Sequence, residues 1–477
     1  MRDTASRRLM SRPADRRRLL QGAGAAGIAA ASLPIMAAAA RAGTVTLVQS
    51  TPTVDISGTS LSILQWQHFV PRFDAWIVPF AQEWGEANDV NVTIDLVNTA
   101  EIPPAIAAEV GAQSGHDIVE HIASLPQFEK AMIDMTDLVE EASRRHGPQL
   151  EMAMRNSFNP TTNTYYGFTH GYAADPGNYR RSLWEMAELP DGPTTYDELL
   201  AGGTQIRSEQ GVQLGIGMSN EIDSKMAAQA LLWAFGGAIQ DENENVVINS
   251  PENAEALAYM ADLFDGAMTA EVFGWNAASN NQLMVAGQAS YILNSISAYR
   301  TAQVQLPDVA EDIFFTLPLV GPAGEERALA HGHAVFTAMI PNYSENIDTA
   351  KEFLLHLVAN YDAAAFESEL YNFPAFPDTV PDLTTDGGLL DEDPFGSEPI
   401  DKLSILKSAV DWTVNLGWPG PANAAIGELF NLPTIPNMMA SAARRELTPE
   451  EALAAAETEI EAIFETWRGE GLVGGGS

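Results

Sequence analysis

The sequence predicts an α/β protein in which helices pack against the faces of a parallel sheet. Strand and helix patterns alternate after about residue 60, the first helix has one apolar face, and 46% of the 477 residues are hydrophobic. Such alternation is typical of β-α-β units, whose strands lie parallel. A chain of this length is sufficient for two or three domains with a sizeable core.

The alternation covers three strands and two helices. Residues 61–66, 91–97 and 116–120 have the short, apolar pattern of strands. The first helix follows residue 70, because apolar side chains recur there at helical spacing: Phe73, Trp76, Ile77, Phe80 and Trp84. Residues 105–112 are expected to form the second helix, which the chain enters through two prolines at 103–104.

The ends of these strands indicate where a ligand would bind. Open parallel sheets bind ligands beyond the carboxyl ends of their strands. The side chains expected at that edge are those of Trp66, Gln67, His68, Asn98, Thr99, Glu120 and His121.

Later helices begin at recognisable capping residues. Thr195 has Glu198 three residues on, which is a capping-box pattern. Ser250 precedes Pro251, and Thr448 precedes Pro449, so both prolines stand at a first helical position. Residues 377–399 are rich in Pro, Asp and Gly and are expected to form a surface loop.

The first 42 residues have the pattern of an export signal. They contain eight arginines against two acidic residues, and an Ala- and Gly-rich stretch follows at 22–40. Arg16 and Arg17 form a pair that resembles the twin-arginine export motif, and residues 40–42 (Ala-Arg-Ala) fit a small-x-small cleavage site. We expect export to the periplasm without a lipid anchor, because the chain has no cysteine. An Arg-rich tail before a core helix is the alternative, but a Gly-Ala run makes a poor core helix.

Composition excludes several function classes. Zero cysteines exclude disulfides, thiolate nucleophiles, Cys-ligated zinc and iron–sulfur clusters. A formal net charge of −39 argues against nucleic-acid binding and predicts a densely acidic surface. No stretch after the leader has 18 consecutive apolar residues, so no membrane span is expected.

The sequence carries no persuasive catalytic motif. It has no G-x-S-x-G, no Walker A motif and no complete G-x-G-x-x-G. His331 and His333 could both reach one metal from an extended segment, but no carboxylate partner or H-E-x-x-H accompanies them, and a polar cleft wall is the preferred interpretation. We therefore expect no metal and no cofactor.

Aromatic residues beside amides and glycines suggest a sugar site instead. An aromatic face can lie on the C–H face of a sugar ring, while amides, histidines and carboxylates satisfy its hydroxyls. The aromatics with such neighbours are Trp66, Tyr172, Trp233, Phe235, Trp275 and Trp418. For any one tryptophan, core packing is the competing interpretation.

Six segments, in order, resemble the extracellular solute-binding proteins of ABC importers, the large family that includes maltose-binding protein. They include "PTTYDEL" at 193–199 and "TPEEAL" at 448–453. The others are residues 166–184, 235–237, 281–289 and 332–357. The sequence departs from the family pattern at Gly332, which has histidines on both sides, and at Asn178 and Arg180–Arg181.

The resemblance implies a two-lobed periplasmic-binding-protein fold of type II, with a mixed or parallel sheet flanked by helices in each lobe. Residues 43–168 and 334–371 would form one lobe, residues 169–333 and 372–472 the other, and residues 473–477 a flexible tail. A sugar or related polyhydroxylated solute would bind between the lobes, and the protein, as a monomer, would deliver it to an ABC permease. The implied ligand-binding residues are Trp66, Gln67, His68, Asn98, Glu120, Tyr172, Asp175, Trp233, Trp275, Asn294, His333 and Trp418.

An exported enzyme is the alternative function class. A cofactor-dependent oxidoreductase would suit twin-arginine export, but no nucleotide fingerprint or cofactor ligand set supports it. A glycoside hydrolase would need two carboxylates about 5 to 9 Å apart in a cleft, a distance that only a structure can give.

Overall fold

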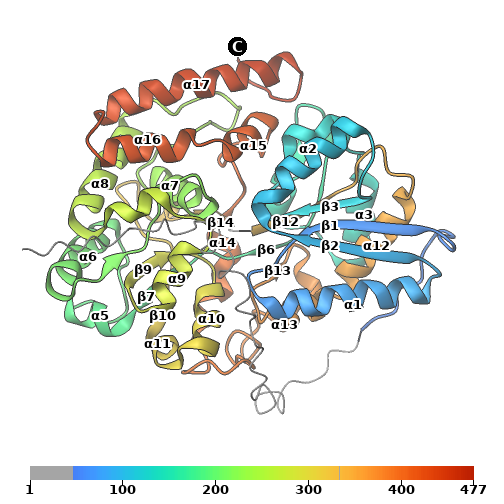
Figure 1. The fold of residues 1–477 in the computed structure, drawn as a ribbon, viewed down its shortest axis with the longest axis horizontal. Coiled ribbons are helices and arrows are strands. Elements are labelled where there is room, and N and C mark those ends of the chain that lie inside the picture. The colour runs from blue at the N-terminus through green and yellow to red at the C-terminus, as the bar shows by residue number, and fades with distance from the viewer. Residues whose placement is uncertain (1–46, 332–333, 477) are drawn as a thin grey trace, which may run out of the picture. The chain divides into compact units, whose positions relative to one another are not determined.

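A computed structural model of the chain describes residues 47–331 and 334–476. The predicted export signal and cleavage site, and His333, lie outside the described residues. Two sheets organise the described part: a six-stranded sheet in the order β13-β6-β12-β3-β1-β2 and a four-stranded sheet in the order β10-β7-β9-β8 (Figure 1). The α/β class expected from the sequence is confirmed.

The strands have the following bounds: β1 Ser60–Trp66, β2 Asn91–Val97, β3 Ile118–His121, β4 Phe158–Asn159, β5 Thr164–Tyr165, β6 Phe168–Ala173, β7 Gly177–Arg180, β8 Gln213–Leu214, β9 Ala289–Leu293, β10 Ile313–Thr316, β11 Ala330–His331, β12 Ala334–Met339, β13 Phe373–Pro374 and β14 Thr413–Val414.

The α-helices are α1 Pro71–Ala87, α2 Ile102–Ala112, α3 Thr136–His146, α4 Glu151–Arg155, α5 Arg181–Met186, α6 Tyr196–Gln210, α7 Ile222–Ala234, α8 Pro251–Ala267, α9 Ser279–Val285, α10 Ser297–Gln305, α11 Pro307–Asp312, α12 Ile347–Ala359, α13 Tyr361–Glu367, α14 Ala409–Trp412, α15 Ala424–Asn431, α16 Thr434–Ala443 and α17 Pro449–Gly469.

The first sheet contains the predicted parallel unit. β1 pairs in parallel with both β2 and β3, so the carboxyl ends of the three strands meet at one edge. In Figure 1, α1 lies on one side of these strands and α2 on the other. α1 buries the apolar face that the spacing predicted, including Phe73, Ile77, Phe80 and Trp84. β12, from much later in the chain, pairs antiparallel with β3 and β6, so the sheet is mixed.

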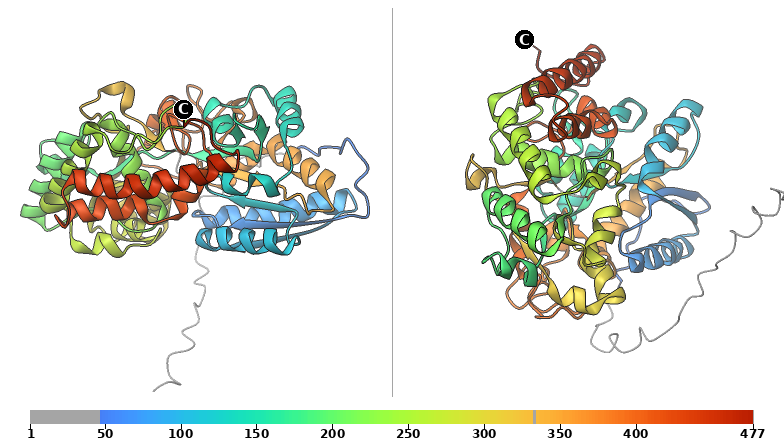
Figure 2. Two further views of the ribbon diagram at one scale, coloured as in Figure 1. Left: turned by 90° about the horizontal axis from the view of Figure 1, so that it is seen from above. Right: turned by 60° about the vertical axis from the view of Figure 1, so that its left-hand side comes forward.

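The second sheet is small and mostly antiparallel. β7 pairs antiparallel with β9 and β10, whereas β8 pairs in parallel with β9. α5, α6 and α9 contact its strands, while the C-terminal helices α16 and α17 pack side by side on α8 (Figure 2).

Capping explains where several helices begin. The Thr195 hydroxyl accepts from the Glu198 N–H, and Glu198 bonds back to the cap, as the sequence predicted. Thr448 and Glu451 form the same reciprocal arrangement at α17, and Ser250 caps α8. Each cap satisfies N–H groups that a helix start leaves without partners.

The two ends of the described chain are fixed by hydrogen bonds. Near the start, the Val48 N–H donates to Asn360 and the Thr53 N–H donates to Glu352, both on or next to α12. Near the end, the Gly474 N–H donates to Glu244. Among residues 47–331 and 334–476, no helix combines the length and the apolar character needed to cross a membrane.

Candidate ligand-binding site

His68 follows the end of β1 and is buried. The Val70 N–H donates to its Nδ1 at 2.9 Å, so Nε2 carries the proton and donates to Asn372 Oδ1, also at 2.9 Å. Burial lowers the pKa of His68 to about 4, although Asn372 Oδ1 and the Val70 carbonyl oxygen, which favour the protonated ring, oppose the shift. At neutral pH this edge of the sheet therefore presents an uncharged imidazole, while the neighbouring Gln67 is exposed.

Phe336 of β12 lies at the centre of a buried ring cluster, which we call the aromatic cluster. Ring centroids lie between 5.8 and 6.4 Å from that of Phe336 for Trp66, His170, His68 and Tyr371. Three of the five rings come from strands of the first sheet, and His68 and Tyr371 each lie two residues from one. Trp66 is only 1% exposed, so it packs in the core of this sheet.

Glu120, near the carboxyl end of β3, lies at the same edge of the first sheet as His68. Its carboxylate accepts from Gln65 Nε2 and contacts His170 Nε2, each at 3.2 Å, and all three side chains are buried. Within residues 47–331 and 334–476, His170 Nδ1 and the Tyr361 hydroxyl have no hydrogen-bond partner. Position 171 must be glycine here, since an added Cβ would meet the Tyr361 hydroxyl at 1.5 Å.

Amide groups gather at the end of β9, in what we call the amide cluster. Asn294 Nδ2 donates to Asp223 Oδ2 at 3.3 Å, Asn280 Oδ1 at 3.2 Å and Asn281 Oδ1 at 2.5 Å. Asn280 also donates to Asp223, at 2.8 Å. Asp223 lies in the first turn of α7, and the asparagines at 280 and 281 lie on α9, so three elements of the second sheet's layer build this cluster.

Tyr371 connects the two clusters. Its ring is stacked with Phe336. Burial raises the pKa of its hydroxyl, the nearby Ser295 hydroxyl opposes the rise, and the charges of Asp175 and Asp223 add to it. The Ser295 hydroxyl in turn donates to Asn294 Oδ1 at 3.3 Å. The aromatic cluster of the first sheet and the amide cluster of the second thus meet at Tyr371 and Ser295.

Three of the predicted tryptophans lie on the side of the second sheet. Trp233 is buried, and its indole N–H donates to the Trp418 carbonyl at 3.0 Å. Trp418 is half-buried, with the Arg327 guanidinium 4.8 Å from its ring centroid. Trp275 is half-buried, and its carbonyl accepts from Ser219, three residues before α7. Trp275 therefore lies near the start of α7, where Asp223 is located.

The remaining predicted residues are spread around this region. Asn98 is exposed and caps a short 3-10 helix after β2, where Thr99 also contacts the His121 ring. Asp175 is buried between β6 and β7. Tyr172 borders a small apolar pocket of about 160 Å³ together with Leu150 and Phe373.

Sequence reasoning did not identify Asp223, Asn280, Phe336, Tyr361, Tyr371 or Asn372 as site residues. A signal existed for two of them, because Tyr371-Asn372-Phe373 places an amide between aromatic residues, the same criterion that selected the tryptophans. In the described residues, no group of three or more His, Asp or Glu side chains is arranged to hold a metal ion.

Comparison with solved structures supports the fold. The chain superposes on maltose-bound MalE3 of T. maritima with a TM-score of 0.70 and 18% identity, covering 85% of this chain and 100% of that one. The TM-score with a sugar transporter from Arthrobacter chlorophenolicus A6 with bound laminaribiose is 0.69 at 15% identity, covering 84% of this chain and 99% of that one. With an ABC transporter solute-binding protein from Agrobacterium radiobacter K84 in complex with ribitol, the TM-score is 0.68 at 17% identity, covering 87% of this chain and 100% of that one. These likenesses confirm the two-lobed type II fold.

Comparison of sequences identifies the family. A protein of Brucella abortus (strain 2308) named as a binding protein is 25% identical over 105 residues, which is 22% of this chain and 26% of that protein. The match therefore spans about a quarter of that relative's length. The family model for the bacterial extracellular solute-binding proteins matches residues 69–361, more than half of the chain. The chain therefore belongs to the bacterial extracellular solute-binding protein family.

Proposed function

We propose that this protein captures a sugar or a related polyhydroxylated solute between its two lobes and delivers it to the membrane permease of an ABC importer. Each lobe is centred on one of the two sheets. No covalent chemistry is involved. The protein acts as a monomer in the periplasm, after export by its twin-arginine signal and cleavage near Ala42.

The meeting of the aromatic and amide clusters carries this proposal. Ring faces from one sheet and amide groups from the other are the two kinds of surface that a sugar requires. The aromatic cluster includes Trp66 at the carboxyl end of the parallel strand β1, where open parallel sheets bind ligands. The neutral His68 and the hydroxyls of Tyr371 and Ser295 add uncharged hydrogen-bonding groups. The ligands of the similar structures, maltose, laminaribiose and ribitol, are all polyhydroxylated.

Among the predicted ligand residues, we propose that His68, Trp275 and Asn294 contact the solute, together with Tyr371. A solute that touches both sheets binds the closed arrangement more tightly than the open one, and this difference in affinity drives closure. The permease would then recognise the closed arrangement.

The test uses protein purified from its own exporting host. Native mass spectrometry should detect a non-covalently bound polyhydroxylated solute, and N-terminal sequencing should begin near Gly43. Calorimetric titration with the released solute should show weaker binding for Asn294→Ala and Tyr371→Phe than for the wild type. Asn249→Ala, at an exposed position bonded to Glu457, is the matched control. Turnover of the solute to a new product would overturn the binding-protein proposal in favour of an enzyme.

A further inference from the structure

Residues 391–402, which we call the bridging segment, lie between helices that belong to different sheets. α1 packs on β2 of the first sheet, whereas α10 packs on α9, which contacts β9 of the second. Phe395 of the bridging segment lies between them, with the guanidinium carbons of Arg72 from α1 and Arg300 from α10 each 5.2 Å from its ring centroid. One aromatic side chain therefore touches both layers of the molecule.

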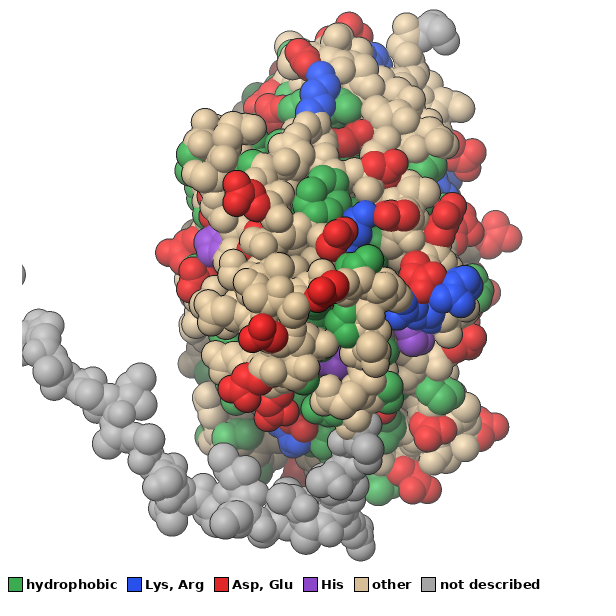
Figure 3. Space-filling model, turned by 90° about the vertical axis from the view of Figure 1, so that its right-hand side faces the viewer, with side chains coloured by type: hydrophobic (Ala, Val, Ile, Leu, Met, Phe, Trp, Pro, Cys, Tyr) green, Lys and Arg blue, Asp and Glu red, His purple; other side chains and the backbone are tan. Residues whose placement is uncertain are grey.

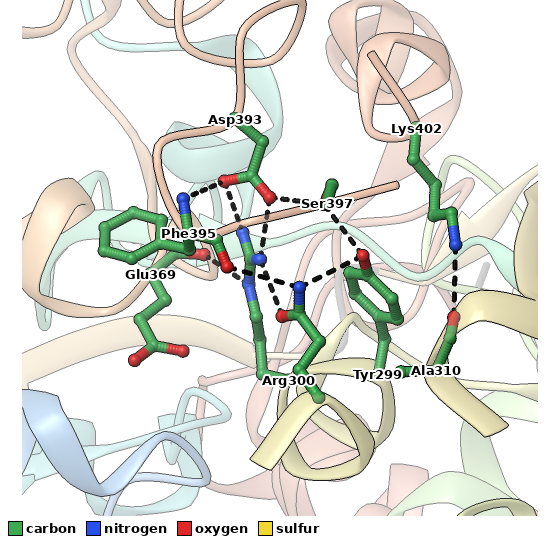
Figure 4. Close-up of polar contacts among 9 residues, drawn as sticks. Tyr299, Arg300, Ala310, Glu369, Asp393, Phe395, Ser397 and Lys402 are labelled. Carbon is green, nitrogen blue, oxygen red and sulfur yellow. Dashed lines mark hydrogen bonds and ion pairs between the residues drawn. The ribbon is translucent and has the colours of Figure 1, made fainter. Parts of the chain in front are cut away.

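The bridging segment is firmly attached to α10 (Figure 4). Arg300 donates two parallel hydrogen bonds to Asp393, at 2.8 and 3.0 Å, and the two side chains are 2% and 0% exposed. The Tyr299 hydroxyl donates to Ser397 at 2.8 Å. Breaking a buried, bidentate ion pair is costly, because it leaves one charge without compensation in a medium of low dielectric. This end of the segment must therefore move together with α10.

A second attachment continues the same connection to α11. Lys402 Nζ donates to the carbonyls of Ala310 and Glu311, at 3.1 and 3.2 Å. These carbonyls lie in the last turn of α11, where a cation is electrostatically favoured. Residues 393 to 402 are thus held at both ends against α10 and α11.

Arg300 also holds the part of the chain that enters the candidate ligand site. Its Nε donates to the Glu369 carbonyl at 2.9 Å. Glu369 and Leu370 have φ values of 56° and 66°, so the chain turns sharply there through the left-handed region before it reaches Tyr371. The arginine that fixes the bridging segment therefore also fixes the approach to Tyr371.

The contact with α1 is of a weaker kind. The Arg72 side chain is 38% exposed and donates to Glu367 at 2.6 Å. Its guanidinium lies 5.0 Å from the ring centroid of Phe366, which itself packs on Phe395 with centroids 4.9 Å apart. An ion pair and cation–π contacts made by an exposed arginine contribute less free energy than a buried, bidentate ion pair, so the contacts of Arg72 can break while the Arg300–Asp393 pair holds.

We propose that residues 391–402 are a brace between the two lobes, fixed to one lobe by Arg300 and Asp393 and released from the other at Arg72 and Phe395 when the lobes separate. The brace sets the balance between open and closed arrangements in the absence of solute. The proposal rests on the two-lobed closure described under the proposed function.

The absence of cysteine in the natural chain makes a direct test practical. Spin labels at Glu86→Cys on α1 and Gln210→Cys on α6, both exposed positions, report the distance between the lobes in the unliganded full-length protein. In pulsed electron spin resonance, Arg72→Gln should raise the ratio of long to short distances by roughly two- to fivefold, as expected for loss of one exposed cation–π contact. Phe395→Leu, which keeps apolar volume but removes the ring face, should shift the ratio in the same direction.

Arg445→Gln is the matched control, because Arg445 is also an exposed arginine with carboxylate partners, Asp262 and Asp265, but lies away from the bridging segment. The expected result is a shift for Arg72→Gln and Phe395→Leu and none for Arg445→Gln, with melting temperatures close to that of the labelled parent. Distance distributions that coincide for all three variants and the parent would overturn the brace. Failure of the proposed function would appear separately, as the absence of bound solute in native mass spectra.

Discussion

At the residue scale, His68 shows how burial defines the chemistry of the candidate site. The imidazole is 6% exposed and bonded on both nitrogens, so its neutral form is the one that the fold stabilises. An imidazole held neutral and in one orientation by these two bonds introduces no charge at the site, which suits an uncharged solute.

His68 should make stability depend on pH. The unfolded imidazole binds a proton below its ordinary pKa of 6.5, whereas the folded one does so only near its lowered pKa of about 4. Between these pH values the unfolded state binds more protons than the folded state. The stabilising contribution of His68 is therefore complete above pH 6.5 and is lost as the pH falls toward 4. The contribution should be about 2 kcal/mol smaller at pH 5 than at pH 7. Urea unfolding should show that the free energy of unfolding changes less between pH 7 and pH 5 for His68→Gln than for the wild type. An equal change in the two proteins would contradict a lowered pKa for His68.

Trp66 and Trp275 should respond differently to truncation. Trp66 is 1% exposed within the aromatic cluster, so Trp66→Ala leaves a cavity and should lower the free energy of unfolding by about 3–5 kcal/mol. Trp275 is half-buried, so Trp275→Ala should mainly weaken solute binding. Thermal melting and calorimetric titration separate the two effects. A Trp66→Ala protein that melts like the wild type would show that Trp66 is not a core residue.

At the element scale, side-chain contacts between distant segments decide which elements move together. The buried pair of Arg300 and Asp393 joins α10 to a segment with no long helix or strand of its own. Lys402, at the end of the same segment, provides the helix-end contact to α11. A segment rich in Pro, Asp and Gly can therefore be held as firmly as a helix.

Replacement of Asp393 should be strongly destabilising. Asp393→Ala leaves the buried Arg300 guanidinium without its carboxylate, which should cost about 3–5 kcal/mol of unfolding free energy. The matched control is Asp386→Ala, since Asp386 is fully exposed and its partner Lys407 keeps Asp391. Guanidinium unfolding of both variants checks this, and equal losses for the two would refute the role of the buried pair.

At the scale of the whole molecule, charge is the dominant feature. The chain has 64 acidic and 25 basic residues, and acidic side chains are spread over the face shown in Figure 3 rather than gathered in one patch. Like charges at this density repel one another across the folded surface and work against the compact state.

Salt should therefore stabilise the protein by screening this repulsion. At 0.5 M ionic strength the Debye length falls well below its value of about 10 Å at 0.1 M, so repulsion between surface carboxylates weakens. The melting temperature should rise between 20 mM and 500 mM NaCl and rise equally with KCl. A control at pH 4, where carboxylates begin to protonate, should show a smaller rise. A melting temperature that does not depend on salt would contradict this prediction.

The sequence by itself determined the β1-α1-β2-α2-β3 order, the helix starts at Thr195, Ser250 and Thr448, and membership of the family. These features depend on residues within a few positions of one another, so periodicity and capping patterns reveal them. The sequence also located the strand ends, and hence His68 and Glu120 near the carboxyl edge of the first sheet.

Only the tertiary structure decided which side chains meet there. His68 bonds Asn372, 304 positions away, and Arg300 pairs with Asp393, 93 positions away. It also decided that Trp66 is buried while Trp275 stays half-exposed, although both stand beside polar residues in the sequence. Such contacts depend on how sheets and crossing segments pack, and no pattern of neighbouring residues encodes that packing.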